Sequence, residues 1–530
     1  MAAYAYIDVS RKQAFIYKHN KLSDNLNNSF IIKSVTEKME GMDSEEVGIS
    51  LSGYLQKYHP DQSEVVHSGG GNSIVRFKDL AQGKAFVQGY SREVLKAYPD
   101  LELYISLVND TEEGIGDGEE QEKQIRALLY KKADQLKEKR RARFRRWTYG
   151  VEKIDETGQA ERSNEGEPRQ HHKLSRNYLH QRFEQRLAGT RIKITSELQH
   201  YKKNEEGKSY IGVLVIDGNR MGEMLQRIST FERLTAFGKE VENIYQTAVI
   251  DALKSFDRFV SGHKEVETSP SFYVTPILMA GDDICLITEA EYAIEIAAKI
   301  LQNIEGIYEL EKQRDSFIKE ILSGGAFTAC AGVAIVKYTY PFFEAVKAAE
   351  ALCHRAKEMR YKAKDKEGRP ADVSFIDWEI LQGQVERDKA YENYVKHGRD
   401  GESFHIKPLC IGQQQAVTEE GIYSYKAFMR LVGKIRRDEE VSTSLLEDLK
   451  RNLYGGWEQY ELFFEMRQGS KRLTDIVQDI FGDSCICRNA ARISEEGRIT
   501  SYTYILNDVL DVLPFMSNQE VGAYVTEAEL

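Results

Sequence analysis

Short apolar runs and helically spaced apolar residues alternate in the same order at two places in the chain. At the first place, residues 3–10 predict a buried strand, and the residues that follow, up to about 55, predict a helix. Residues 63–77 hold two β-rich runs around a glycine turn, which indicates a hairpin. A helical pattern over 78–98 and a strand over 101–108 complete a β-α-β-β-α-β unit.

The same unit recurs after residue 209. Its predicted elements are a strand at 210–217, a helix from 218 to about 256 with one break, strands at 271–279 and 284–288, a helix at 289–313, a strand at 326–336, a helix at 341–364 and a further strand at 373–377. An internal duplication of this kind predicts two ferredoxin-like domains, each with the strand order 4-1-3-2.

The remaining segments are predicted to be helical. Residues 110–200 are rich in charge and poor in aliphatic side chains, which favours a helical, partly mobile connector. Beyond residue 377, apolar positions recur at spacings of three and four. The predicted fold class is therefore α+β, with a first ferredoxin-like domain at 1–110, a charged helical connector at 111–205, a second ferredoxin-like domain at 206–376 and a C-terminal helical domain at 377–530.

Composition and charge narrow the class of protein. The 530 residues carry a formal net charge of −11, which does not favour a free nucleic-acid binder. No apolar run reaches ~18 residues and the N-terminus lacks a signal peptide, so a cytoplasmic protein without a membrane partner is expected. Among six cysteines only Cys485 and Cys487 are close together, so reduced thiols and no zinc site are expected.

One segment, residues 131–147, departs from this charge balance because it is strongly basic. It predicts either a solvated helix face or a surface that contacts phosphate or a partner. The second interpretation assigns that contact to Arg140, Arg141, Arg143, Arg145 and Arg146.

Three acidic residues are expected to meet in the second domain. Asp217 ends its first strand, and Asp282 and Asp283 lie in the turn that leads into its third strand. In the order 4-1-3-2 these strands are antiparallel neighbours, so all three carboxylates reach one edge of the sheet. Such a cluster is costly unless cations neutralise it. Two Mg²⁺ or Mn²⁺ ions, about 4 Å apart, would do so and would activate a 3′-hydroxyl against an α-phosphate.

The residues around this cluster suit a nucleotide. Gly218, Asn219, Arg220, Met221 and Gly222 lead into a helix, whose backbone N–H groups favour a triphosphate. The backbone of Gly218 adds a candidate metal contact beside the carboxylates. Gly281 lets the hairpin backbone approach a nucleotide closely, and Lys357 on the last helix is a candidate clamp for the β- and γ-phosphates. An ordinary surface lysine remains the alternative for Lys357.

The motifs resemble a known family. Residues 211–225 (IGVLVIDGNRMGEML), 277–288 (ILMAGDDICLIT) and 328–360 resemble the second palm domain of the large subunit of type III CRISPR effector complexes, the CRISPR polymerase related to GGDEF cyclases. Residues 6–22 and 65–77 resemble that family's first palm, including its glycine-rich hairpin. The resemblance covers both ferredoxin-like domains and, more loosely, the helical C-terminus.

The resemblance implies an activity and partners. The family converts ATP into cyclic oligoadenylate messengers when its complex of protein subunits and guide RNA binds target RNA, and Asp217, Asp282 and Asp283 match its metal-binding carboxylates. The first palm has Gly69-Gly70-Gly71-Asn72 in the place of carboxylates, so it resembles the inactive palm, with Asp8 alone remaining. No His-Asp pair precedes it, so an HD nuclease is not expected.

Two departures concern the second palm. Its hairpin reads AGDD where GGDD is usual, and Asn219 stands where a D-x-D motif has its second aspartate. Asn219 is expected to accept a metal-bound water without adding charge. Two other functions stay open on the sequence: a stand-alone palm cyclase or AMP-conjugating enzyme that needs no RNA, and a scaffold subunit without activity. An intact carboxylate set argues against the scaffold.

Overall fold

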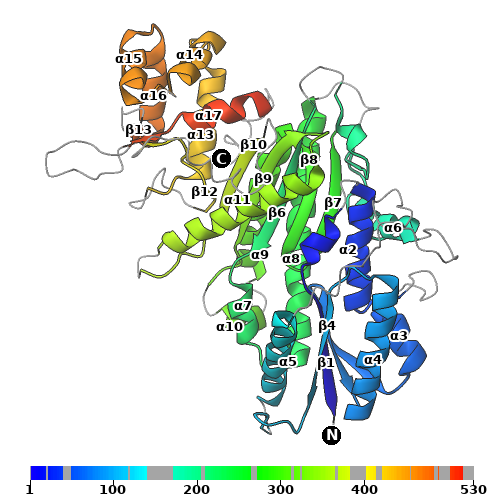
Figure 1. Cartoon of the computed structure of the whole chain (residues 1–530). Coiled ribbons are helices and arrows are strands. Elements are labelled where there is room, and N and C mark those ends of the chain that lie inside the picture. The colour runs from blue at the N-terminus through cyan, green and yellow to red at the C-terminus, as the bar shows by residue number, and fades with distance from the viewer. Residues whose placement is uncertain are drawn as a thin grey trace.

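The computed structural model describes residues 2–18, 22–39, 49–116, 118, 120–139, 171–203, 209–263, 271–311, 316–322, 325–364, 368–381, 402–412, 421–453, 455–482, 487–488 and 502–516. Two α/β palm domains lie end to end, with the first at the bottom of Figure 1, the second in the centre and the helical C-terminal domain at the top left. Arg140, Arg141, Arg143, Arg145 and Arg146 lie outside the described residues, as does the helix predicted after residue 381.

The first palm is a four-stranded antiparallel sheet in the order β2-β3-β1-β4, which is the predicted 4-1-3-2 order. Its strands are β1 (Ala3–Val9), β2 (Ser63–Gly69), β3 (Asn72–Phe77) and β4 (Leu103–Asn109). The long helix α4 (Leu80–Ala97) begins at Asp79, whose side chain accepts a hydrogen bond from the Gln82 N–H. In the stretch predicted to be helical up to about residue 55, the described residues form three helices, α1 (Lys12–Ile16), α2 (Leu22–Thr36) and α3 (Leu51–Tyr58).

The second palm repeats this order within a larger sheet. Seven strands run in the order β12-β10-β9-β6-β8-β7-β5, and the central four give 4-1-3-2 again. The strands are β5 (Lys193–Ile194), β6 (Tyr210–Gly218), β7 (Tyr273–Ala280), β8 (Asp283–Glu289), β9 (Ala329–Lys337), β10 (Phe375–Leu381) and β12 (Leu409–Cys410). The further strand predicted at 373–377 is confirmed as β10, which pairs parallel to β9.

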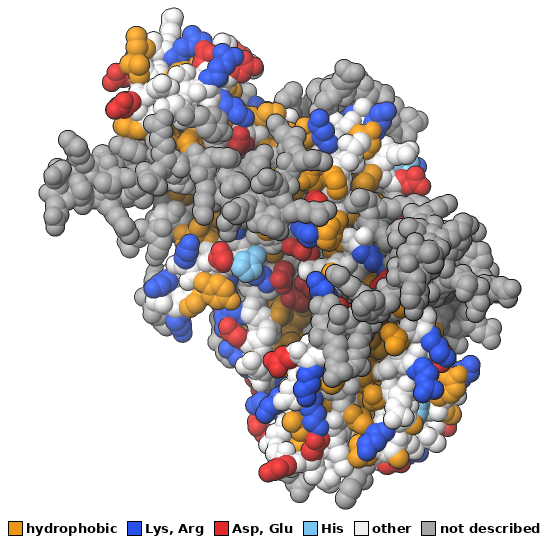
Figure 2. Space-filling model, in the orientation of Figure 1, with side chains coloured by type: hydrophobic (Ala, Val, Ile, Leu, Met, Phe, Trp, Pro, Cys, Tyr) orange, Lys and Arg blue, Asp and Glu red, His pale blue; other side chains and the backbone are white. Residues whose placement is uncertain are grey.

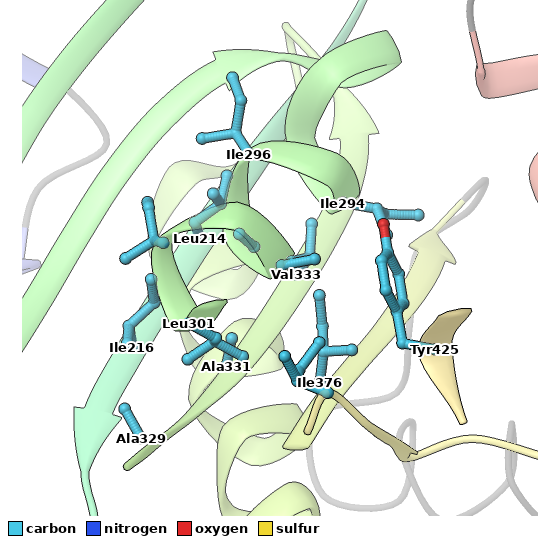
Figure 3. Packing of buried hydrophobic residues seen from close by; sticks show 14 of the residues in the cluster. Leu214, Ile216, Ile294, Ile296, Leu301, Ala329, Ala331, Val333, Ile376 and Tyr425 are labelled. Carbon is cyan, nitrogen blue, oxygen red and sulfur yellow. The ribbon is translucent and has the colours of Figure 1, made fainter. Parts of the chain in front are cut away.

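Helices cover both faces of this sheet. They are α7 (Met221–Gln226), α8 (Phe231–His263), α9 (Ala290–Glu311), α10 (Ser316–Leu322) and α11 (Phe342–Lys362). Figure 3 shows α9 packed through Ile294 and Leu301 over residues of β6, β9 and β10. Glycines in the sheet permit close packing of two of these helices. A Cβ on Gly212 would lie 2.1 Å from Ala293 Cβ of α9, and a Cβ on Gly332 would lie 2.0 Å from the Ala349 carbonyl oxygen of α11.

The connector and the C-terminal domain extend the same core. The connector contributes α5 (Gln121–Glu138) and α6 (His171–Arg186). The C-terminal domain contains α13 (Tyr425–Arg437), α14 (Thr443–Leu453), α15 (Trp457–Met466), α16 (Ser470–Phe481), α17 (Asn507–Val512) and a small sheet of β11 (Glu402–Ser403), β13 (Cys487–Arg488) and β14 (Tyr502–Tyr504). One hydrophobic cluster joins residues of both palms, α5 and α13. None of the described helices is both long and apolar enough to cross a membrane.

Candidate active site

The predicted acidic residues come together where β6 ends and β8 begins. Ile216 pairs with Ile284, so Asp217 and Asp283 are the next residues along the two antiparallel strands. The β7–β8 hairpin closes with Ala280 opposite Asp283, and Gly281 in its turn has a φ of 63°, a conformation that favours glycine. The fold therefore places all three carboxylates at one edge of the sheet, as the strand order requires.

The approach is close enough to exclude a side chain at Gly218. A Cβ there would lie 2.7 Å from Asp282 Oδ2 and 2.8 Å from Asp282 Cβ. The backbone of Gly218 instead contributes a hydrogen bond that favours the ionised form of Asp282. Gly218 thus allows the hairpin carboxylate to lie directly against the end of β6.

Two carboxyl groups of the cluster, Asp282 and Asp283, have raised pKa values. Burial and the charge of Asp217 raise the pKa of Asp282 to about 6. Asp283 faces solvent, yet the surrounding protein and the charges of Asp282 and Asp217 raise its pKa to about 7. Both carboxyls therefore hold protons more tightly than an ordinary aspartate, which is the expected result of crowding like charges.

Lys357 supplies a cation to Asp217. Its ammonium group lies 2.5 Å from Asp217 Oδ2 and donates to the Gly218 carbonyl oxygen over 3.0 Å. α11 positions it by burying Phe342, Val346, Ala349, Cys353 and Ala356, the stripe that its spacing predicts. Burial lowers the pKa of Lys357, but the charge of Asp217 and the hydrogen bond to it, with smaller effects of Cys353 and Cys330, together raise the pKa, so the ammonium stays charged.

The donor set fits divalent cations. Carboxylate oxygens with a nearby backbone carbonyl are the ligands that Mg²⁺ and Mn²⁺ prefer. Among the described residues, no three His, Cys, Asp or Glu side chains are gathered tightly enough to hold a metal ion as they stand. Like carboxylates repel one another, and Lys357 occupies one oxygen of Asp217. Cations that relieved the repulsion would draw the three side chains together.

The residues after Asp217 have other roles than the sequence suggested. Asn219 is buried: its amide donates to Thr328 Oγ1 over 2.9 Å, and its carbonyl oxygen accepts from the Cys330 thiol over 3.4 Å. Both polar ends of Asn219 thus have hydrogen-bond partners inside the protein, and the contact with a metal-bound water remains a prediction. The guanidinium of Arg220 makes two hydrogen bonds, 2.7 and 2.9 Å, to the Asp372 carboxylate.

The helix expected to bind phosphate is short. α7 has six residues, and Met221 and Gly222 form its first turn. Arg220 precedes it in a left-handed conformation, with a φ of 61°. A helix of this length has a weak dipole, so its N-terminus adds little to any binding of phosphate. The basic side chain of Lys357 is the stronger candidate.

The first palm closes the site from the other side. A cavity of about 460 Å³ lies between the palms, and Asp283, Ala280 and Met279 line it from the second palm. Asp8, Lys12 and Gly71 line it from the first palm, and Lys137 lines it from α5. In the view of Figure 2, acidic side chains lie at the floor of a hollow in the middle of the molecule.

Two of these lining residues escaped sequence reasoning. Lys12 follows Asp8 by four positions, as Met221 follows Asp217, so an alignment of the two repeats would have drawn attention to it. Lys137 gave no signal of its own, because it belongs to a helix whose position over the first palm depends on the fold.

Comparisons with known proteins agree with this geometry. Residues 210–366 match the model of the second palm domain of Cas10/Cmr2. Three crystal structures of a Csm1-Csm4 cassette share the fold over 97% of this chain. The complex with AMPPNP has a TM-score of 0.52, 12% identity and 70% of its own chain covered. The complexes with pppApApA and cA4 have TM-scores of 0.51 and 0.50, identities of 13% and 12%, and 69% of their own chains covered. No curated protein sequence matches the chain.

Proposed function

We propose that this chain, whose residues 210–366 match the second palm domain of Cas10/Cmr2, is a nucleotidyltransferase that makes cyclic oligoadenylates from ATP. The observation that carries the proposal is the group of Asp217, Asp282 and Asp283, where burial and the crowding of like charges raise the pKa of Asp282 and Asp283 to about 6 and 7. A protein keeps a destabilising group of carboxylates for a function, and binding of divalent cations is the simplest one.

Each residue has a role in this reaction. Asp217, Asp282 and Asp283 hold the metal ions, with the backbone of Gly218 beside them. Two bound divalent cations supply Lewis-acid activation of the attacking hydroxyl and stabilise the charge on the phosphate. Lys357 orients Asp217 and lies where it can contact the β- and γ-phosphates of a bound nucleotide. Gly281 keeps the hairpin free of a side chain where the nucleotide approaches.

The cavity between the palms supports nucleotides as the substrate class. It carries apolar side chains suited to a base, such as Phe30 and Phe183, and polar groups beside Asp283. The choice of ATP rests on the family, since the similar Csm1-Csm4 structures were solved with AMPPNP, pppApApA and cA4.

The same relatives suggest the partners. They are complexes of Csm1 with Csm4, so we propose that this chain is the large subunit of a type III CRISPR complex in the cytoplasm, with guide RNA and target RNA. The basic segment at Arg140, Arg141, Arg143, Arg145 and Arg146 is a candidate contact for RNA or another subunit.

The test compares the wild-type protein with the Asp282→Asn/Asp283→Asn variant. Each protein is incubated with each NTP and Mg²⁺ or Mn²⁺, in the presence and in the absence of its complex and target RNA. Mass spectrometry should find cyclic oligoadenylates from the wild type only, while the variant keeps its thermal stability because crowding of charge is relieved. Product that needs no RNA would favour a stand-alone cyclase or AMP-conjugating enzyme. No product under any condition would favour a scaffold, and product from the variant would refute the metal site.

A further inference from the structure

One carboxylate outside the acidic cluster joins two of the elements that build the candidate site. Asp372 lies in the segment that leads into β10, and it accepts two hydrogen bonds from Arg220 Nη1, 2.7 and 2.9 Å long. The Nη2 atom of Arg360 lies 3.6 Å from Asp372 Oδ1. Arg220 belongs to the loop between β6 and α7, and Arg360 belongs to the last turn of α11. The carboxylate therefore bridges that loop and that helix.

Both arginines follow a residue of the candidate site at the same spacing. Arg220 is the third residue after Asp217, and Arg360 is the third residue after Lys357. Three residues are nearly one helical turn, so Arg360 and Lys357 are neighbours along α11. Asp217 and Lys357 are themselves an ion pair. Asp372 thus makes a second connection between the same loop and the same helix.

The contact with Asp372 also holds an unusual backbone at Arg220. Its φ of 61° is in the left-handed region, which crowds the Cβ of any residue other than glycine. The Nε atom of Arg220 donates to Glu223 over 2.9 Å, but the Glu223 side chain is 59% exposed, and such an ion pair contributes little. The hydrogen bonds to Asp372 are the largest influence that raises the pKa of Arg220. Asp372 is therefore the partner that fixes the loop after Asp217.

The surroundings of Asp372 are shaped to receive a carboxylate. A Cβ on Gly325 would lie 2.6 Å from Asp372 Oδ2, so the glycine leaves room for this oxygen. Arg360 is buried, and its Nε atom has no hydrogen-bond partner among the described residues. Its guanidinium also lies over the ring of Tyr361, 5.3 Å from the ring centre. A buried guanidinium needs a counter-charge, and Asp372 supplies one.

We propose that Asp372 is a positioning residue of the candidate active site, which fixes the Asp217 loop relative to the helix of Lys357. It acts through Arg220 and Arg360 rather than on the metal ions or the nucleotide. A cation that replaced Lys357 as the partner of Asp217 would break the first connection between loop and helix. The second connection, at Asp372, would then keep the carboxylate and the ammonium at their spacing. This role rests on the proposed function.

The test measures Mn²⁺ binding by the full-length protein without nucleotide, from the electron paramagnetic resonance signal of the free ion. Asp372→Asn keeps the shape of the side chain and removes its charge. It should weaken Mn²⁺ binding about tenfold, the lower end of the usual effect of removing a group that supports metal ligands, and it should lower kcat. Asp372→Glu restores the carboxylate and should recover most of both losses.

The matched control is Asp438→Asn, because Asp438 forms an ion pair of 2.6 Å with Arg472 in the C-terminal domain. It should leave Mn²⁺ binding and kcat unchanged. Arg220→Gln removes the same connection from the loop side. The double variant Arg220→Gln/Asp372→Asn should therefore bind Mn²⁺ no more weakly than the weaker single variant. Equal Mn²⁺ affinity in the Asp372→Asn and Asp438→Asn proteins, or additive losses in the double variant, would overturn the proposal.

A thermal melt checks that each variant folds. Should Asp372→Asn not fold, Arg220→Gln alone, at a side chain that is 24% exposed, gives the same comparison with the control.

The inference and the proposed function fail in different ways. Weakened Mn²⁺ binding in the Asp372→Asn protein, with no product from any protein, would support the positioning role and refute nucleotidyl transfer. Wild-type product, with Mn²⁺ affinity and kcat unchanged by Asp372→Asn, would refute the positioning role alone. A wild-type protein that binds no Mn²⁺ would refute both.

Discussion

Lys357 and Asp217 form an ion pair in which the ammonium lies 2.5 Å from the carboxylate, and the same ammonium donates to the carbonyl oxygen of Gly218. Without a divalent cation, Lys357 is the counter-charge of Asp217. If a cation takes over that role, the ammonium is still held at Gly218 and can turn toward a phosphate. In the proposed reaction, the pair would link nucleotide binding to the arrangement of the three carboxylates.

Replacing Lys357 with methionine should reduce kcat/KM for the nucleotide by about 10- to 100-fold, the worth of one or two charge-assisted hydrogen bonds. Steady-state kinetics of product formation measure this effect. Lys347→Met is the matched control, because Lys347 lies on the same helix and is 52% exposed. Unchanged kinetics in the Lys357→Met protein would mean that Lys357 does not contact the nucleotide and is an ordinary structural lysine.

Asn219→Asp restores the D-x-D pattern in sequence but should not add a fourth metal-binding carboxylate. The side chain is buried against Thr328 and Cys330, so the substitution loses a hydrogen-bond donor and buries a charge. Denaturant unfolding should show a loss of at least about 2 kcal/mol at pH 8. Higher activity with undiminished stability would instead show that residue 219 faces the metal ions.

Asp217 and Asn219 differ in how much of their surroundings the sequence could predict. Alternating runs and the duplication predicted both sheets, their strand order and the meeting of Asp217 with the hairpin, because these follow from local pattern and antiparallel pairing. The direction of the Asn219 side chain depends on Thr328 at the start of β9, a contact with no local signal. The ion pair of Asp8 with Lys137 depends on the connector in the same way. The domain boundaries remain predictions.

Arg126 holds the second palm's α7–α8 turn against the connector. Its guanidinium is buried and donates to the carbonyl oxygens of Leu225 and Ile228 over 2.9 and 2.7 Å. These carbonyls lie at the C-terminal end of α7, where a positive charge is favoured. Glu122, one turn earlier on α5, accepts from the Phe231 N–H at the start of α8.

Arg126→Ala should therefore destabilise the protein by about 3 kcal/mol, since two buried carbonyls lose a charged partner. It should also lower product formation, because α7 directly follows the Asp217 motif. Denaturant unfolding and turnover are measured together, with Lys123→Ala on the same helix as an exposed control. A change within about 0.5 kcal/mol, the usual effect at a surface site, would contradict the role given to Arg126.

Glu350 on α11 predicts a dependence of stability on pH. Burial raises its pKa from 4.5 to about 7, and Lys347 offsets only part of this. The folded state thus binds the proton more tightly than the unfolded chain. The stability that protonation contributes is present below pH 4.5 and is lost as pH rises from there to about 7.

Glu350→Gln should consequently stabilise the protein at pH 8 and have a much smaller effect at pH 5. A tenfold change in proton affinity is worth about 1.4 kcal/mol, so the gain at pH 8 is at most about 3 kcal/mol. Denaturant unfolding of both proteins at the two pH values measures it. Glu358→Gln, at a carboxylate that is 61% exposed on the same helix, should give no such difference. An equal gain at pH 5 and pH 8 would mean that the ionisation of Glu350 is not its cause.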